Sequence, residues 1–156
     1  MEVAGTTGIN SQVTDFVHLD DGASVADGTV AWAPQEITDQ SGGAAVAAGA
    51  DKNIFVLVGS IFADTDAVET AIETGDYELT IVAGTDDKDA FIVVYSDGTN
   101  AFIASAHFIV NPGTDISSGD LVVTNLLQIS GVTAIAGTAG IANDGTLAAN
   151  NLAFLA

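Results

Sequence analysis

The chain of 156 residues carries 21 acidic side chains against two lysines and no arginine, and its formal net charge is −19. Nucleic acid and anionic lipid headgroups are bound through clustered lysine and arginine, so neither partner is expected, and no segment is predicted to insert into a membrane. Hydrophobic residues make up 48% of the sequence, enough for the core of one ordinary domain. There is no cysteine, which excludes disulfides and thiolate chemistry.

The chain is predicted to begin with an extended arm over residues 1–15. A single β-rich domain over residues 16–156 follows it. Short apolar segments at 13–19 and 30–32 are separated by Asp-Gly turn signals. Residues 40–49 are mostly glycine and alanine with few bulky apolar side chains, and they favour either a flexible loop or a thin strand.

The pattern becomes clearer after residue 53. Five consecutive apolar residues predict a buried strand over 53–59. Residues 64–75 predict a helix of two to three turns, because Asp66 and Glu69 resemble a capping box and the apolar side chains follow helical spacing. Gly75 suits the left-handed position that ends a helix.

Strands dominate the remainder of the chain. A strand is predicted over 78–82, and residues 91–95 and 101–110 form a hairpin around an Asp-Gly turn. Leucines and isoleucines between Ser118 or Asp120 and Gly131 favour a second short helix. Final strands are expected at 132–136 and 152–155. The predicted fold class is therefore mainly β or α+β, an antiparallel β-sandwich-like domain with one or two short helices.

Part of the sequence resembles a known group of proteins. The matching pieces are 55–59 (FVLVG), 67–73 (AVETAIE), 89–101 (DAFIVVYSDGTNA) and 131–135 (GVTAI), with a short apolar end at 150–156 (NNLAFLA). They resemble the C-terminal domains of bacterial RTX-type, type I-secreted extracellular or surface proteins, many of which are associated with calcium. The resemblance covers about half the chain and implies an extracellular location. The glycine-rich calcium-binding nonapeptide of that family is absent, so none of its ligands is carried over.

Two acidic loops are candidate calcium sites. Asp86, Asp87 and Asp89 place three carboxylates within four residues, and Ca²⁺ takes six to eight oxygen ligands. The second loop contributes Asp20, Asp21 and Asp27. The alternative is that both are solvated acidic loops, with Lys88 offsetting one charge of the first.

Catalytic chemistry has little support in the sequence. His18 and His107 are the only histidines, and both lie in apolar runs that favour packed rather than catalytic histidines. No serine lies in a nucleophile-elbow context, and no phosphate-binding loop is present. The protein is therefore predicted not to be an enzyme.

The function that best fits these features is a secreted structural subunit that self-assembles into an extracellular filament, sheath or surface layer, stabilised by calcium. The partner is then a second copy of the chain. The N-terminal arm, with Val3, Ile9 and Val13, is predicted to add a strand to a neighbour, since an open sheet edge accepts such a strand.

Three alternatives remain open. The chain could be a calcium-dependent module that binds cell-surface polysaccharide, or an adhesin. It could be a carrier domain whose C-terminal end directs type I secretion. A cytoplasmic enzyme adapted to high salt would explain the charge but lacks a catalytic set of residues.

Overall fold

The structure is a computed structural model. It describes residues 15–16, 33–41, 45–49, 52–81, 85–113, 115–136 and 146–148.

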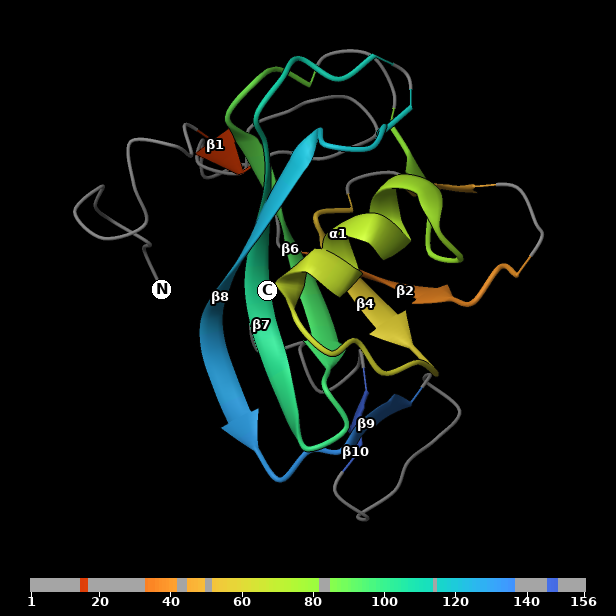
Figure 1. Cartoon of the computed structure of the whole chain (residues 1–156), viewed down its shortest axis with the longest axis vertical. Helices are drawn as coiled ribbons and strands as arrows, with labels where there is room; N and C mark the ends of the chain where they lie inside the picture. Colours follow the sequence, from red (N-terminus) through yellow and green to blue (C-terminus); the bar gives the residue numbers. More distant parts are fainter. Residues whose placement is uncertain are drawn as a thin grey trace.

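The main feature is a mixed β-sheet with the strand order β2-β4-β6-β7-β8, in which β1 also pairs with β6 (Figure 1). Its strands are β1 (Asp15–Phe16), β2 (Pro34–Thr38), β4 (Ile54–Val58), β6 (Asp89–Ser96), β7 (Asn100–Phe108) and β8 (Leu121–Ser130). Two small parallel pairs accompany it, β3 (Val46–Ala47) with β5 (Leu79–Thr80) and β9 (Ala134–Ala136) with β10 (Thr146–Ala148). The predicted β-rich class with a short helix is confirmed.

Strand direction differs between the two halves of the sheet. Strands β2, β4 and β6 run parallel, whereas β6, β7 and β8 are antiparallel. The hairpin signals in the sequence predict antiparallel pairing, and this holds for β6, β7 and β8 but not for β2, β4 and β6. The parallel half arises because the chain crosses over through α1 (Thr65–Thr74) between β4 and β6, and parallel neighbours need such a connection. All five side chains of β4 are buried, as is usual for a parallel strand that is covered on both faces.

Helix α1 lies within the range predicted for it, but its ends differ in detail. Asp64 rather than Asp66 is the N-cap, and its carboxylate accepts a hydrogen bond of 2.9 Å from the Ala67 amide. The terminal Gly75 has a φ of −104°, so it is not left-handed. A glycine suits this position because a Cβ would come within 2.8 Å of the Ala71 Cα.

The hairpin between β6 and β7 is confirmed, with Gly98 in its turn at a φ of 87°, as the Asp-Gly signal requires. The second helix predicted between Ser118 and Gly131 is wrong, because strand β8 occupies this segment. Its apolar spacing also fits a helix, but Val122, Val123 and Thr124 are β-branched and β7 pairs with them.

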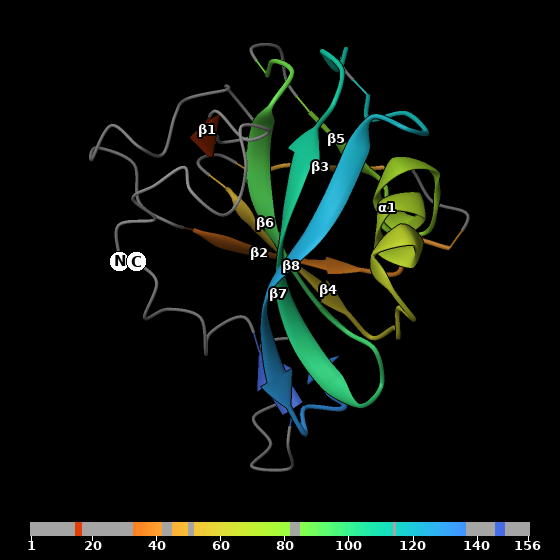
Figure 2. The same cartoon turned by 60° about the vertical axis from the view of Figure 1, so that its left-hand side comes forward.

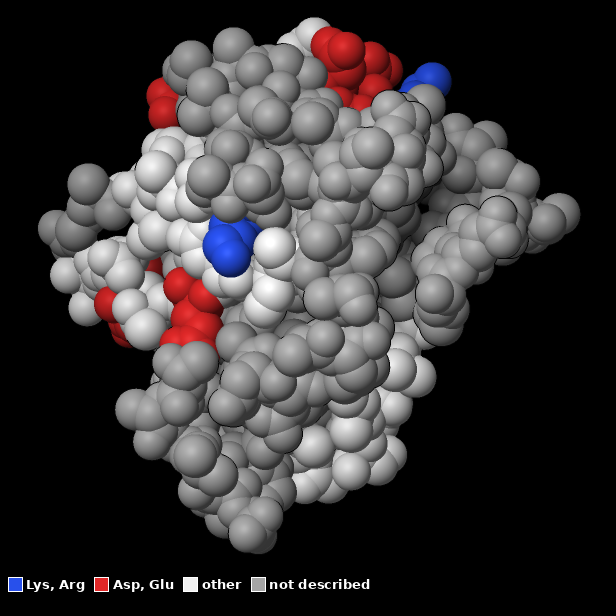
Figure 3. Space-filling model, turned by 180° about the vertical axis from the view of Figure 1, so that it is seen from behind, with Lys and Arg blue, Asp and Glu red and all other residues white. Residues whose placement is uncertain are grey.

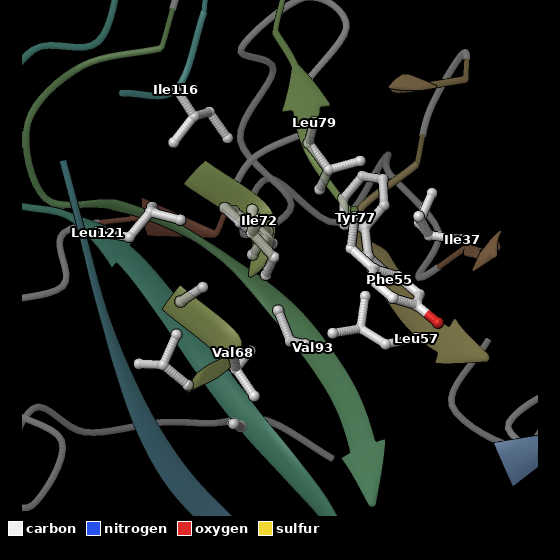
Figure 4. Packing of buried hydrophobic residues seen from close by; sticks show 14 of the residues in the cluster. Ile37, Phe55, Leu57, Val68, Ile72, Tyr77, Leu79, Val93, Ile116 and Leu121 are labelled. Atoms are coloured by element: carbon white, nitrogen blue, oxygen red, sulfur yellow. The ribbon is translucent and has the colours of Figure 1, made fainter. Parts of the chain in front are cut away.

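The core lies mainly between the helix-bearing face of the sheet and α1. Val68 and Ile72 of α1 face Phe55, Leu57 and other buried side chains of the sheet (Figure 4). A smaller cluster that includes Val56, Val94 and Ile135 occupies the opposite face. Burial of the apolar stripe of α1 thus fixes the helix against the sheet and places its other side chains near β8.

Candidate functional site

The first predicted calcium loop forms a turn that leads into β6. Asp86 and Asp87 are exposed, whereas Asp89 is largely buried. The Asp89 carboxylate accepts a hydrogen bond of 2.7 Å from the Asp86 amide, and the Asn111 side-chain amide donates to Asp86 Oδ1 at 3.1 Å. Lys88 adopts a positive φ of 73°, and its amide donates to the Phe108 carbonyl at 2.7 Å. Two of the three carboxylates therefore stabilise the turn.

Calcium binding stays a prediction. Among the described residues, no three His, Cys, Asp or Glu side chains converge as metal ligands would. Asp20, Asp21 and Asp27 of the second loop lie outside the described part of the chain.

The predicted assembly arm lies almost wholly outside the described residues, and this includes Val3, Ile9 and Val13. Only its last residue is described. Asp15 belongs to β1, which pairs in parallel with the start of β6, Asp15 opposite Asp89.

A second acidic feature, missed by the sequence analysis, joins α1 to β8. The Glu73 carboxylate is only 5% exposed and accepts hydrogen bonds of 2.9 Å from the amides of Gly119 and Leu121. One turn earlier, Glu69 accepts a bond of 2.6 Å from the Val123 amide. Burial raises the pKa of Glu69, and the bond from Val123 partly offsets that rise. The two carboxylates thus occupy the outer edge of β8 in its first half, where α1 lies beside it (Figure 2).

The second half of β8 is different. Leu126 is an extra residue in a β-bulge, because Ile103 pairs with Leu127 while its neighbour Ala104 pairs with Asn125. Leu126 and Leu127 are 37% and 54% exposed. In the described sheet no strand pairs with the outer side of β8, which forms the left edge in Figure 1. This half is an open sheet edge with apolar side chains on the surface.

The open edge also lacks charge. Between Asp120 and Asp144 the sequence has no acidic or basic residue, although the chain has 21 acids. Seen from behind, the described atoms at the lower right of Figure 3 include neither red nor blue. This uncharged stretch is the sequence signal that could have identified the edge.

His107 lies buried in β7, which agrees with the packed histidine that the sequence favoured. Burial lowers its pKa, and a hydrogen bond with the Val122 backbone opposes this effect. Within the described residues, neither His107 Nδ1 nor the hydroxyl of buried Ser105 has a hydrogen-bond partner. His18 lies outside the described part.

Comparisons of the chain with known protein families, curated proteins and solved structures gave no match. The resemblance to RTX C-terminal domains therefore stays a prediction. No helix in the described residues is long and apolar enough to cross a membrane.

Proposed function

We propose that the protein is a secreted structural subunit that assembles with copies of itself into an extracellular filament, sheath or surface layer. The observation that carries this proposal is the open, uncharged edge of β8 with its exposed Leu126 and Leu127. Soluble proteins usually protect such edges with charged side chains, proline or a covering element, because an open edge accepts a strand from another chain. The described residues supply that protection only along the first half of β8.

The overall charge adds a condition to this assembly. Two copies, each with a net charge of −19, repel one another, and the repulsion has to be screened by salt or by a divalent cation before they associate. Calcium is the proposed divalent cation, since its preferred ligands are carboxylate oxygens, and these are abundant on this chain.

The experiment is negative-stain electron microscopy of the purified protein in millimolar Ca²⁺, after EDTA, and in high salt without Ca²⁺. Ordered filaments or sheets that form with Ca²⁺ and dissolve in EDTA support both the structural role and the calcium dependence. Polymers that form in high salt and ignore EDTA support the structural role alone. A monomer in every buffer contradicts the proposal and directs attention to polysaccharide binding.

A further inference from the structure

The two halves of β8 differ in what occupies their outer edge. In the first half, the amides of Leu121 and Val123 point away from β7 and donate to the carboxylates of α1. After the bulge, the pairs Leu127–Ile103 and Ile129–Ala101 continue the ladder with β7. Because backbone groups alternate in direction along a strand and the bulge adds one residue, Gln128 and Ser130 direct their N–H and C=O groups outwards.

The absence of charged side chains near Gln128 and Ser130 indicates which kind of strand can pair with their outward N–H and C=O groups. The last three residues of β8 and the bulge contain no charged side chain, and neither does any residue from 121 to 143. A second copy of this acidic chain that approaches residues 126–130 therefore meets no acidic side chain of β8 that would repel it. The opposite edge of the sheet is less suitable, because β2 contains Glu36 and is followed directly by Asp39.

We propose that residues 126–130 pair antiparallel with the same residues of a second copy, about a two-fold axis near Gln128. This rests on the proposed function and names one of its contacts. A two-fold contact closes between two copies, so a filament or layer needs a second contact at another surface. In such an isologous interface each copy contributes the same surface, so one uncharged strand serves both sides. The sheet then continues from one copy into its partner, and the added strand lies beside Leu126 and Leu127 and reduces their exposure to water.

The carboxylates of α1 limit the length of this pairing. Glu69 and Glu73 already occupy the outer amides at 121 and 123, so a neighbouring strand cannot extend along the whole of β8. About five residues from each copy remain, which places the contact among small, weak interfaces. Its strength therefore depends on screening: added salt tightens it, which is the reverse of an interface held by ion pairs.

The test is sedimentation velocity of the full chain over a concentration series, at about 0.05 M and about 0.5 M NaCl. Gln128→Pro removes an outward N–H while leaving the ladder with β7 intact, as proline does on edge strands, and Gln128→Ala is its matched control. We expect the proline variant to raise the dimer dissociation constant at least about tenfold and the alanine variant to change it less than about threefold.

Charge variants identify the two-fold axis and do not depend on the proline variant folding well. At such an axis Gln128→Glu and Gln128→Lys each face their own copy, so both weaken the dimer. If Gln128 instead met another, acidic surface, lysine would strengthen association, and this result would overturn the proposal. Thr38→Glu, at an exposed position of β2 on the opposite edge of the sheet, controls for added charge and is expected to leave the dimer unchanged.

The remaining outcomes separate this inference from the proposed function. If polymers form in the microscope but ignore every change at Gln128, the function stands and the β8 contact is wrong. If deletion of residues 1–13 abolishes the dimer while the Gln128 variants leave it intact, the N-terminal arm is the contact instead. If no association occurs at either salt concentration, both proposals are wrong.

Discussion

Replacement of Glu73 by alanine tests whether the carboxylates of α1 stabilise the domain. Glu73 is the acceptor for the amides of Gly119 and Leu121, and the Leu121 amide is buried. An unsatisfied buried amide costs about 1–3 kcal/mol, and loss of the more exposed bond at Gly119 costs about 0.5–1.5 kcal/mol. The better helix propensity of alanine returns only about 0.4 kcal/mol. We expect Glu73→Ala to lower the free energy of unfolding by about 1–4 kcal/mol.

Urea unfolding followed by far-UV circular dichroism measures this change. Glu73→Gln keeps one acceptor oxygen and is expected to lose roughly half as much stability as the alanine variant. Asp87→Asn is the matched control, since it also removes one negative charge, but from an exposed turn, and its effect is expected to stay within about 0.5 kcal/mol. If Glu73→Ala destabilises the protein no more than Asp87→Asn does, the carboxylate does not stabilise the edge of β8.

Three further changes test other parts of the structure. Burial lowers the pKa of His107, so below about pH 6.5 the unfolded chain binds a proton more readily than the folded chain, and stability falls as the pH drops. His107→Leu should reduce the loss of unfolding free energy between pH 7.5 and pH 5, measured by urea titration. If the variant loses as much stability as the original chain, this explanation is wrong. Asp64→Ala removes the acceptor for the Ala67 amide and should cost about 1 kcal/mol of unfolding free energy; a neutral result would mean that the cap contributes nothing. Gly75→Ala forces a Cβ against the helix backbone and should lower the melting temperature, with a cost of about 1–3 kcal/mol, whereas Gly113→Ala meets nothing and should not; equal melting temperatures would contradict the crowding at Gly75.

The spacing of apolar and turn-forming residues was enough to predict those helices, strands and turns that depend on their own residues. The continuous apolar run of β4, the Asp-Gly turn at Gly98 and the apolar spacing of α1 each lead to the observed element. The segment after Asp120 was assigned wrongly because its apolar residues fit a helix as well as a strand. Pairing with β7 decides the outcome, and that partner lies elsewhere in the sequence.

The candidate sites show the same division between local and distant causes. The sequence places Asp86, Asp87 and Asp89 together in a loop; the structure confirms this for Asp86 and Asp87, whereas Asp89 is the first residue of β6. It gives no sign that the Glu73 carboxylate meets an amide 48 residues later in the chain. Such contacts depend on how α1 packs across the sheet, so they follow from tertiary structure and not from spacing along the helix.

Hydrogen–deuterium exchange of the assembled and the dissociated protein shows whether the open edge of β8 becomes buried between copies. We expect the outward amides of Gln128 and Ser130 to exchange more slowly in the assembled protein. The Leu121 and Val123 amides, already bonded to α1, should change little. Unchanged exchange at Gln128 and Ser130, with new protection at other residues, would show that assembly uses a different surface.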